Sequence, residues 1–297
     1  MTHGGPAAVG RPDGAPGDGV VRVGVDVGGT KLLLVAVGPR LHREHRAPTG
    51  PEAGPAEVER EVRGFLARTG LRPRSLGIAV PGLLDAAGRV AACDVLPRLE
   101  GWRPADALVE LGIPVRALND AEAALAGETH GLRPDATAGI VMAGTAIGAA
   151  FRVGGSPLRG ARGWAGELGY LPLSTGGEVR RLDELAGGAW IARRLRTDGA
   201  GLAERAARGD AAALSAIREA GAALGLGLAA GVNLLNPELL VLGGGAAELP
   251  GYREAALASA ARHALPQLWA ACEVRPPRHG EAAAALGAAY ASAHPAR

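Results

Sequence analysis

A turn near the start of the chain carries residue types that bind phosphate groups and Mg²⁺. The segment D-V-G-G-T-K (26–31) joins two apolar stretches and contains the single lysine among 32 basic residues. Glycines let the backbone approach a phosphate closely, and the N–H groups of such a turn point at its oxygens. Asp26 would hold Mg²⁺ directly or through water. An ordinary hairpin turn is the alternative, but it does not explain why these residue types meet in one turn: Asp26, Gly28, Gly29, Thr30 and Lys31.

A second turn of the same kind lies in G-T-A-I-G (144–148). Gly144 and Thr145 would offer backbone N–H groups and a hydroxyl to the terminal phosphates of a nucleotide. A plain hairpin is again the alternative, but the pairing of two such turns favours phosphate binding. Gly243 and Gly244 belong to a run of three glycines, which would let a nucleoside lie against the backbone or would simply form a flexible turn.

The segment A-L-N-D-A-E (117–122) supplies a candidate general base. It follows the apolar stretch I-P-V-R-A-L and precedes a predicted helix. Asn119 or Asp120 suits the N-cap of that helix, with Glu122 closing a capping box. Asp120 also suits a carboxylate that accepts the proton of a hydroxyl during phosphoryl transfer. Both roles are compatible if Asn119 caps the helix while Asp120 faces the substrate.

Two further acidic segments suit the recognition of hydroxyl groups. Glu167 lies in W-A-G-E-L-G-Y, between glycines and close to Trp164. Carboxylates accept hydrogen bonds from pairs of donors, although a glutamate in a loop is usually just solvated. Asp183 and Glu184 lie in R-R-L-D-E-L, where a solvated helix face with neighbouring arginines is the alternative interpretation.

The composition is that of a globular protein with about two domains. The chain has 297 residues, of which 47% are hydrophobic and 21% charged. A net charge of +2 gives no global case for nucleic acid or an anionic membrane, and no apolar run reaches the roughly 18 residues of a membrane span. Two distant cysteines, Cys93 and Cys272, fit a reducing cytoplasm. Residues 1–20 lack the apolar core of a signal peptide and predict a disordered tail.

Alternating strand and helix patterns must position these residues. The predicted strands are 20–27, 31–38, 41–47, 75–80, 113–118, 138–144, 147–153, 238–243 and 272–275. The predicted helices are 56–69, 120–130, 179–196, 202–207, 210–235, 251–265 and 281–292, with a loop over 154–177. The two Gly-Thr turns echo each other between paired strands. The sequence therefore predicts an α/β fold of two similar domains, with a ligand held in the cleft between them.

The order of these motifs resembles the ROK sugar-kinase family, within the hexokinase–actin ATPase fold. Six segments match it in order: VGVDVGGTK, GIAVPGLLD, the LND helix, GTAIG, RGARGWAGELGY and GVNLLNPELLVLGGG. The resemblance implies ATP with Mg²⁺ as the phosphate donor and Asp120 as the base. It implies nucleotide contacts from Gly29, Thr30, Thr145 and Gly244. It implies acceptor contacts from Pro81, Gly82, Asn119, Asp120 and Glu167.

Departures from the family pattern fall mainly on the acceptor side. Tyr170 stands where the family has a histidine that contacts both the sugar and a zinc ion. The segment that follows has no cysteine, so no zinc site is predicted. Asp183 matches the family's acidic sugar contact but is one methylene shorter than its glutamate, and Ala146 replaces a glycine of the phosphate turn. Altered polar groups imply an altered acceptor, such as an unusual hexose, an amino sugar or a cyclitol.

We therefore expect an ATP-dependent kinase for a sugar or sugar-like polyol. A small domain is predicted over 21–118, completed by a C-terminal helix at about 281–297, with a large domain over 119–280. The alternatives are a non-catalytic sugar-binding or regulatory protein derived from a kinase, and an ATPase without a small acceptor. The resemblance also implies a homodimer. Residues 1–20 cannot encode the helix-turn-helix of the family's repressors, so no nucleic-acid partner is expected.

Overall fold

The computed structural model describes residues 20–293 and contains two five-stranded sheets of the same topology. The N-terminal sheet has the strand order β3-β2-β1-β4-β7, and the C-terminal sheet has the order β10-β9-β8-β13-β14. In each sheet the first three strands pair antiparallel and the last two join in parallel. The predicted α/β fold with two similar halves is confirmed. Residues 1–19 of the predicted tail lie outside the described residues.

The elements have the following bounds. The N-terminal sheet contains β1 (Arg22–Val27), β2 (Lys31–Gly38), β3 (Leu41–Pro48), β4 (Ser75–Val80) and β7 (Val115–Asn119). The C-terminal sheet contains β8 (Ala138–Ala143), β9 (Ile147–Val153), β10 (Ser156–Pro157), β13 (Leu239–Gly243) and β14 (Glu273–Arg275). Two hairpins are formed by β5 (Leu83–Leu84) with β6 (Val90–Ala92) and by β11 (Pro172–Thr175) with β12 (Glu178–Arg181). The helices are α1 (Pro55–Thr69), α2 (Pro104–Ala107), α3 (Asp120–Glu128), α4 (Asp183–Ala186), α5 (Gly188–Arg194), α6 (Gly199–Ala207), α7 (Ala211–Leu235), α8 (Tyr252–His263), α9 (Pro266–Ala271) and α10 (Ala283–Ala291). Short 3-10 helices are η1 (Pro97–Leu99), η2 (Val109–Leu111), η3 (Leu168–Tyr170) and η4 (Gly280–Ala282).

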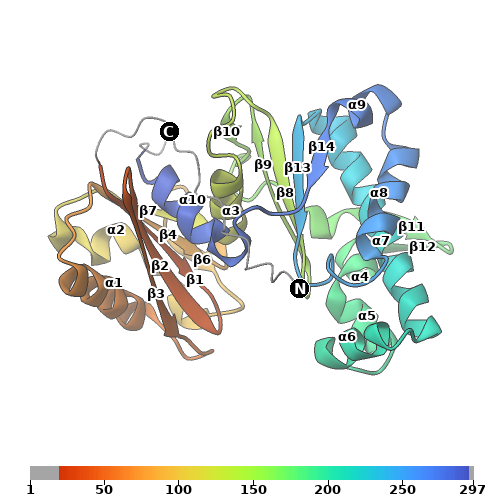
Figure 1. Ribbon diagram of the computed structural model, residues 1–297, viewed down its shortest axis with the longest axis horizontal. Helices are drawn as coiled ribbons and strands as arrows, with labels where there is room; N and C mark the ends of the chain where they lie inside the picture. The colour runs from red at the N-terminus through yellow and green to blue at the C-terminus, as the bar shows by residue number, and fades with distance from the viewer. Residues whose placement is uncertain (1–19, 294–297) are drawn as a thin grey trace, which may run out of the picture.

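Helices α3 and α10 lie between the two sheets, whereas α1 and α2 lie beyond the N-terminal sheet and α7 to α9 beyond the C-terminal sheet (Figure 1). Helix α1 packs Val58, Val62 and Phe65 into the core of the N-terminal sheet. Helix α7 is long enough, and with a mean hydropathy of 1.2 apolar enough, to cross a bilayer. Half of that apolar stretch is buried inside the protein, where α7 packs against α8, so it is a core helix.

In strand β1, successive side chains alternate between the buried core and the face that carries Asp26. Val23 and Val25 are fully buried in the core that includes α1. Successive side chains point to opposite faces of a strand, so Gly24 and Asp26 share the other face. That face meets α10, because a Cβ added to Gly24 would overlap the carbonyl oxygen of Ala285. Asp26 therefore lies on the side of the sheet that faces the second half of the protein.

Glycines bring the backbones of α3 and α10 into direct contact. A Cβ added to Gly287 would overlap the carbonyl oxygen of Ala123, and one added to Gly127 would overlap that of Ala283. Helix α10 also packs against β1, β2 and β4, while α3 packs against β8 and β9. The two helices therefore join the N-terminal half to the C-terminal half, and any extra atom at their contact must push the halves apart.

Gly287→Ala is expected to lower the free energy of unfolding by roughly 1–3 kcal/mol, because the added methyl group overpacks the contact between α3 and α10. Gly199→Ala at the start of α6 is the matched control, since an added Cβ there meets no atom within 4 Å. Urea unfolding of the two variants measures the difference. An equal effect of both substitutions would contradict the close contact.

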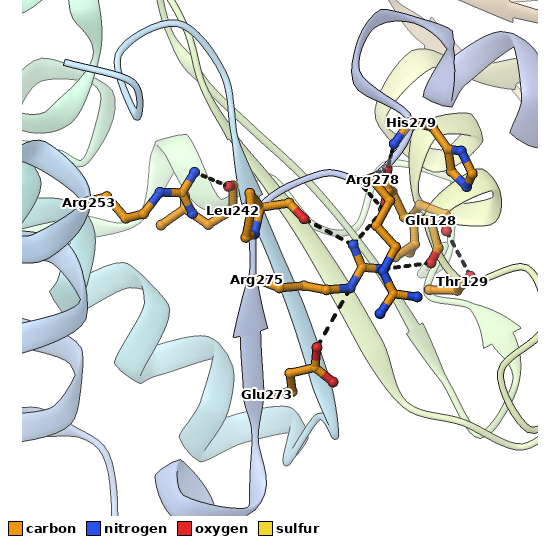
Figure 2. Close-up of polar contacts among 10 residues, drawn as sticks. Glu128, Thr129, Leu242, Arg253, Glu273, Arg275, Arg278 and His279 are labelled. Atoms are coloured by element: carbon orange, nitrogen blue, oxygen red, sulfur yellow. Dashed lines mark hydrogen bonds and ion pairs between the residues drawn. The ribbon is translucent and has the colours of Figure 1, made fainter. Parts of the chain in front are cut away.

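A buried carboxylate ties together the two segments that cross between the sheets. The chain crosses first through α3 and returns from β14 to α10. Glu128 ends α3, its side chain is 0% exposed, and it pairs with Arg275 at 2.7 Å. The backbone N–H groups of Arg278 and His279 donate to the same carboxylate at 2.9 Å, as Figure 2 shows. Burial alone would raise the pKa of Glu128, but the hydrogen bonds from Arg275 and the two N–H groups hold it below its ordinary value.

Glu128→Gln is expected to lower the free energy of unfolding by roughly 3–5 kcal/mol at pH 7, because it leaves the charge of Arg275 buried without its partner. A lowered folded-state pKa means that the carboxylate stabilises the fold above its unfolded pKa of about 4.3. This contribution is lost as the pH falls through the folded-state pKa. The difference between wild type and variant should therefore shrink at pH 3, as urea titrations at both pH values would measure.

Glu204→Gln is the control for this prediction, because the Glu204–Arg208 pair on α6 has the same chemistry but is 66% and 64% exposed. Its loss should cost less than about 1 kcal/mol. If Glu128→Gln cost no more than this control, the ion pair would not hold the two crossings together.

The segment between β10 and α6 differs most from the prediction. A single helix over 179–196 is wrong, because residues 178–181 form β12 and two short helices follow it. Gly176 and Gly177 have φ values of 59° and 87°, which suits the tight turn between β11 and β12. The backbone of Gly187 is extended and separates α4 from α5. The predicted loop over 154–177 contains β10, η3 and β11.

Candidate active site

Thr49, which lies outside the Gly-Gly-Thr turn, donates hydrogen bonds to its backbone carbonyls. The turn itself closes with a hydrogen bond from the Gly28 N–H to the Lys31 carbonyl at 2.9 Å. Thr49 donates its hydroxyl to the Gly28 carbonyl at 2.6 Å and its N–H to the Thr30 carbonyl at 3.0 Å. Thr30 is exposed. The turn is therefore fixed by its carbonyl groups, which leaves the Thr30 hydroxyl accessible to a ligand.

Three parallel strands bring an acid, a loop and a helix cap to one edge of the N-terminal sheet. Asp26 lies near the end of β1, Pro81 follows β4, and Asn119 ends β7. These strands are adjacent, with Asp26 opposite Ala79 and Val80 opposite Asn119. In α/β sheets, ligands bind at the carboxyl ends of parallel strands. The predicted residues of this half therefore gather where a ligand is expected.

Asn119 performs two structural tasks at this edge. Its Oδ1 accepts hydrogen bonds from the N–H groups of Ala121 at 2.9 Å and Glu122 at 3.3 Å, so it caps α3 as predicted. Its Nδ2 donates to the carbonyl of Gly82 at 3.0 Å. One side chain thus fixes both the start of α3 and the Pro81-Gly82 loop. Asp120, the first residue of α3, accepts the Ala121 N–H with Oδ1 at 2.8 Å.

Asp26 and Asp120 are partly buried carboxylates, and the charge of Asp120 acts on Asp26. Burial, and after it the negative charge of Asp120, raises the pKa of Asp26 to about 7. Lys31 opposes this shift, and Glu281 adds to it. Burial also raises the pKa of Asp120, against the hydrogen bonds it receives at the start of α3. Carboxyl groups with raised pKa values in one place are typical of sites that bind a cation or transfer a proton.

The Pro81-Gly82 loop rests on Cys93. The thiol of Cys93 donates to the carbonyl of Pro81 at 3.1 Å. A Cβ added to Gly82 would overlap the carbonyl oxygen of Ala92, so the loop approaches β6 as closely as only glycine allows. Burial and, to a smaller degree, the charge of Asp120 raise the pKa of the Cys93 thiol. Cys93 therefore lies beneath the loop and near Asp120.

Lys31 makes an ion pair that the sequence does not reveal. Its Nζ lies 2.6 Å from Glu281 in η4, where the chain enters α10. Arg46 lies 3.7 Å from the other oxygen of Glu281. The lysine and the glutamate are 43% and 63% exposed, so the pair is open to solvent and to ligands. A phosphate bound by Lys31 would share it with Glu281.

The second Gly-Thr turn is held by the start of α5. The N–H of Gly188 donates to the carbonyl of Gly144 at 2.8 Å, and that of Ala189 donates to the carbonyl of Thr145 at 3.1 Å. Thr145 is exposed, as Thr30 is in the first turn. Both turns are thus fixed through their carbonyl groups and present a threonine to solvent.

The three-glycine run continues the edge that carries the second turn. Strands β8 and β13 are parallel neighbours, so the segments that follow them lie side by side. Gly244 has a φ of 94°, and a Cβ added to it would overlap the carbonyl oxygen of Ala143. Only glycine suits this close crossing of the end of β8. Gly243 and Gly244 therefore share an edge with Gly144 and Thr145.

The candidate acceptor residues form a second carboxylate pair. Burial and the nearby charge of Asp183 raise the pKa of Glu167. Asp183 also accepts the N–H of Ile147 at 2.6 Å, which links it to the end of the second turn. Tyr170 is 59% exposed, and the guanidinium of Arg181 lies 4.9 Å from the centre of its ring. Asp183 therefore has a structural partner of its own, and Tyr170 lies at the surface.

The structure brings the predicted residues into two groups, and a loop joins them. The first group is Asp26, Gly28, Gly29, Thr30, Lys31, Pro81, Gly82, Asn119 and Asp120. The second group is Gly144, Thr145, Glu167, Asp183, Gly243 and Gly244. The indole of Trp164, three residues before Glu167, donates to the carbonyl of Leu84 at 3.1 Å, close to the Pro81-Gly82 loop.

Several site residues are not evident from the sequence. Thr49 and Cys93 lie in short irregular segments and Glu281 in the single turn of η4, where one residue carries no periodic signal. They act through contacts with residues far away in the chain, which spacing does not reveal. The predicted capping box is wrong, because Glu122 pairs with Arg159 at 2.6 Å instead of closing the cap.

The ROK family profile matches residues 22–294 of this chain. A bifunctional enzyme NanE/NanK of Brucella suis biovar 1 is 31% identical over 239 residues, covering 76% of this chain and 45% of that relative, so the chain spans about half its length. Among solved structures, the ROK hexokinase of Thermus thermophilus is 31% identical with a TM-score of 0.79, over 92% of this chain and 98% of that one. A ROK family glucokinase of Streptomyces griseus, solved in complex with glucose and AMPPNP, has a TM-score of 0.73. The match covers 92% of this chain and 99% of that one at 22% identity, so it shows a similar fold.

The carboxyl of Asp26 is expected to titrate near pH 7 in the free protein, and Asp120→Asn should lower that midpoint because it removes a neighbouring negative charge. Lys31→Met should raise it, because Lys31 opposes the shift. Carboxyl ¹³C NMR titrations of the wild type and both variants measure the midpoints. Midpoints that do not move in either variant would mean that the three groups do not lie together.

Proposed function

The chain belongs to the ROK family and has the actin/hexokinase fold, and from this premise we propose that it transfers the γ-phosphoryl group of ATP to a hydroxyl of a sugar or sugar-like polyol. The observation that carries the proposal is that two buried carboxylates with raised pKa values, Asp26 and Asp120, lie at the carboxyl edge of the N-terminal sheet. Asp120 would act as the general base, and the Gly-Thr turns would bind the phosphates.

The residues present fit a nucleotide with Mg²⁺. Two turns with fixed carbonyl groups carry exposed threonines, Thr30 and Thr145, whose hydroxyls would donate to phosphate oxygens. The N–H groups of Gly28 and Gly144 close the turns by bonding to the carbonyls of Lys31 and Ala146, so these glycines would shape the phosphate site rather than donate to it. Gly29 would let the backbone of the first turn approach a phosphate closely. Gly243 and Gly244 would lie against the nucleoside. Among residues 20–293, no three His, Cys, Asp or Glu side chains are arranged to hold a metal ion by themselves. Mg²⁺ usually takes one or two carboxylates and completes its shell with phosphates and water, so Asp26 alone suits it. Bound there, Mg²⁺ would neutralise the charge on the transferred phosphoryl group.

The burial and the raised pKa of Asp120 support its role as the general base. Its carboxylate would accept the proton of the attacking hydroxyl while that oxygen bonds to the γ-phosphorus and the bond to the leaving ADP oxygen breaks. The raised pKa of Asp120 makes it a stronger proton acceptor than an exposed aspartate. Asn119 caps α3, which carries the Asp120 carboxylate, and it also donates to the Gly82 carbonyl in the Pro81-Gly82 loop. One residue would therefore position both the base and the loop between which the acceptor hydroxyl would lie.

The acceptor would be a hexose, an amino sugar or a cyclitol. Named relatives include N-acetylmannosamine kinases and a hexokinase, which supports a sugar. Glu167 and Asp183 would accept hydrogen bonds from acceptor hydroxyls, with Tyr170 at the rim of the site. Because Oδ1 of Asp183 already accepts the Ile147 N–H, the other oxygen would be the freer one for an acceptor hydroxyl. This supports an acceptor different from that of relatives with a longer glutamate.

Further expectations follow from the family. The enzyme would be a cytoplasmic homodimer, and the small domain (21–118 with the C-terminal helix) would close on the large domain (119–280) to exclude water. A non-catalytic regulator is the second candidate, favoured by the pairing of Lys31 with Glu281. ADP release that depends on the added polyol would support the kinase. Release independent of any polyol would indicate a simple ATPase, and no release would indicate the regulator.

Asp120→Asn is expected to lower kcat by about 10²–10⁴-fold, because the variant lacks the proton acceptor. Its affinity for ATP, measured by calorimetry, should stay within about twofold of wild type, since the phosphate turns are untouched. Asp106→Asn on α2 is the control, because Asp106 is 62% exposed and pairs only with Arg103 among the described residues. Near-normal turnover by Asp120→Asn would overturn the assignment of the base.

A further inference from the structure

The loop that carries Glu167 is docked at two points on the elements that carry Asp120 and the Pro81-Gly82 loop. We call residues 158–167 the acceptor loop. Near its start, Nη2 of Arg159 donates to Oε1 of Glu122 on α3 at 2.6 Å. Near its end, the indole of Trp164 donates to the Leu84 carbonyl at 3.1 Å. The loop is also closed on itself by a hydrogen bond from the Ala165 N–H to the Arg159 carbonyl at 3.1 Å.

The Arg159–Glu122 pair is partly buried. Glu122 is 20% exposed and Arg159 is 34% exposed, and Arg116, 17% exposed, lies 3.7 Å from the same carboxylate oxygen. Partial burial reduces screening by solvent, so such a pair contributes more than an exposed one. The pair is therefore well placed to hold the loop, unlike the exposed Glu204–Arg208 pair of equal length.

The position of Glu122 connects this pair to the proposed base. Glu122 lies two residues after Asp120 in the first turn of α3, and its backbone N–H donates to the Asn119 side chain at 3.3 Å. A contact on Glu122 is therefore a contact on the rigid start of the helix that carries Asp120. Glu167 lies at the other end of the loop, beside Asp183.

We infer that Arg159 and Glu122 are positioning residues, which fix the acceptor loop on α3 so that Glu167 binds the acceptor at a set place relative to Asp120. This inference rests on the proposed function, because it assigns the pair a role in acceptor binding. The pair touches neither the phosphate turns nor Asp26, so its loss should affect the acceptor and spare the nucleotide. A purely structural ion pair would instead alter stability or both substrates together.

The test is a double-mutant cycle of Glu122→Gln, Arg159→Gln and the double variant, with Glu204→Gln as the control. Each single variant is expected to raise KM for the acceptor by about 5–20-fold, with kcat and KM for ATP within about twofold of wild type. The double variant should be no worse than Glu122→Gln, because that substitution already removes the contact with Arg159 as well as the weaker one with Arg116. Glu204→Gln should match wild type.

Hydrogen exchange provides a readout that needs no turnover. The amide of Ala165 should exchange faster in Glu122→Gln than in wild type, because the loop loses its contact with α3. Unchanged exchange at Ala165, or equal rises in KM for ATP and the acceptor, would overturn the inference. Wild-type turnover is measured first. If no polyol is phosphorylated, the proposed function fails, and the exchange comparison alone decides whether the pair positions the loop.

Discussion

Two glycines allow the backbones of α3 and α10 to touch between the two sheets, and this contact sets the geometry of the whole site. Gly127 and Gly287 leave no room for even one methyl group at the contact. Because α3 is only nine residues long, fixing its middle also fixes both of its ends. Asp120 lies at one end and Glu128 at the other. The proposed base Asp120 and the Glu128–Arg275 ion pair, which we call the clamp, therefore lie at the two ends of one short rigid helix.

Glu128 joins the two segments that cross between the sheets. Glu128 belongs to the first crossing, and its carboxylate binds Arg275 and two backbone N–H groups of the second. The second crossing leads directly to η4, whose Glu281 reaches Lys31 of the first phosphate turn. The contacts of Glu128 and the Lys31–Glu281 pair thus hold the same short segment of chain, residues 275–281, at its two ends.

The site itself opposes stability. Burial raises the pKa of both Asp26 and Asp120, and the charge of Asp120 raises that of Asp26 further, so their ionised forms are disfavoured in the folded protein. Charged carboxylates are kept there although neutral residues would pack at lower cost. Such a cost is expected where a cation and a transferable proton are to be bound.

Local patterns in the sequence predict the parts of this arrangement that depend on neighbouring residues. The alternation of β1, the two Gly-Thr turns and the cap at Asn119 are all local, and all are present. The hairpin β11–β12 is missed because arginine and glutamate neighbours suggest a helix, whereas Gly176 and Gly177 impose a turn. The Glu128–Arg275 clamp and the Lys31–Glu281 pair join residues distant in the chain, and a single sequence has no signal for such pairs. The roles of the site residues remain predictions.

The most direct test is a crystal structure of the protein bound to a non-hydrolysable ATP analogue and to a polyol that the protein phosphorylates. The account predicts an oxygen of Asp120 about 2.6–3.2 Å from one acceptor hydroxyl, which lies in line with the γ-phosphate. It also predicts both Gly-Thr turns around the phosphates. An acceptor hydroxyl held by Glu167 alone, with Asp120 out of hydrogen-bonding reach, would contradict it.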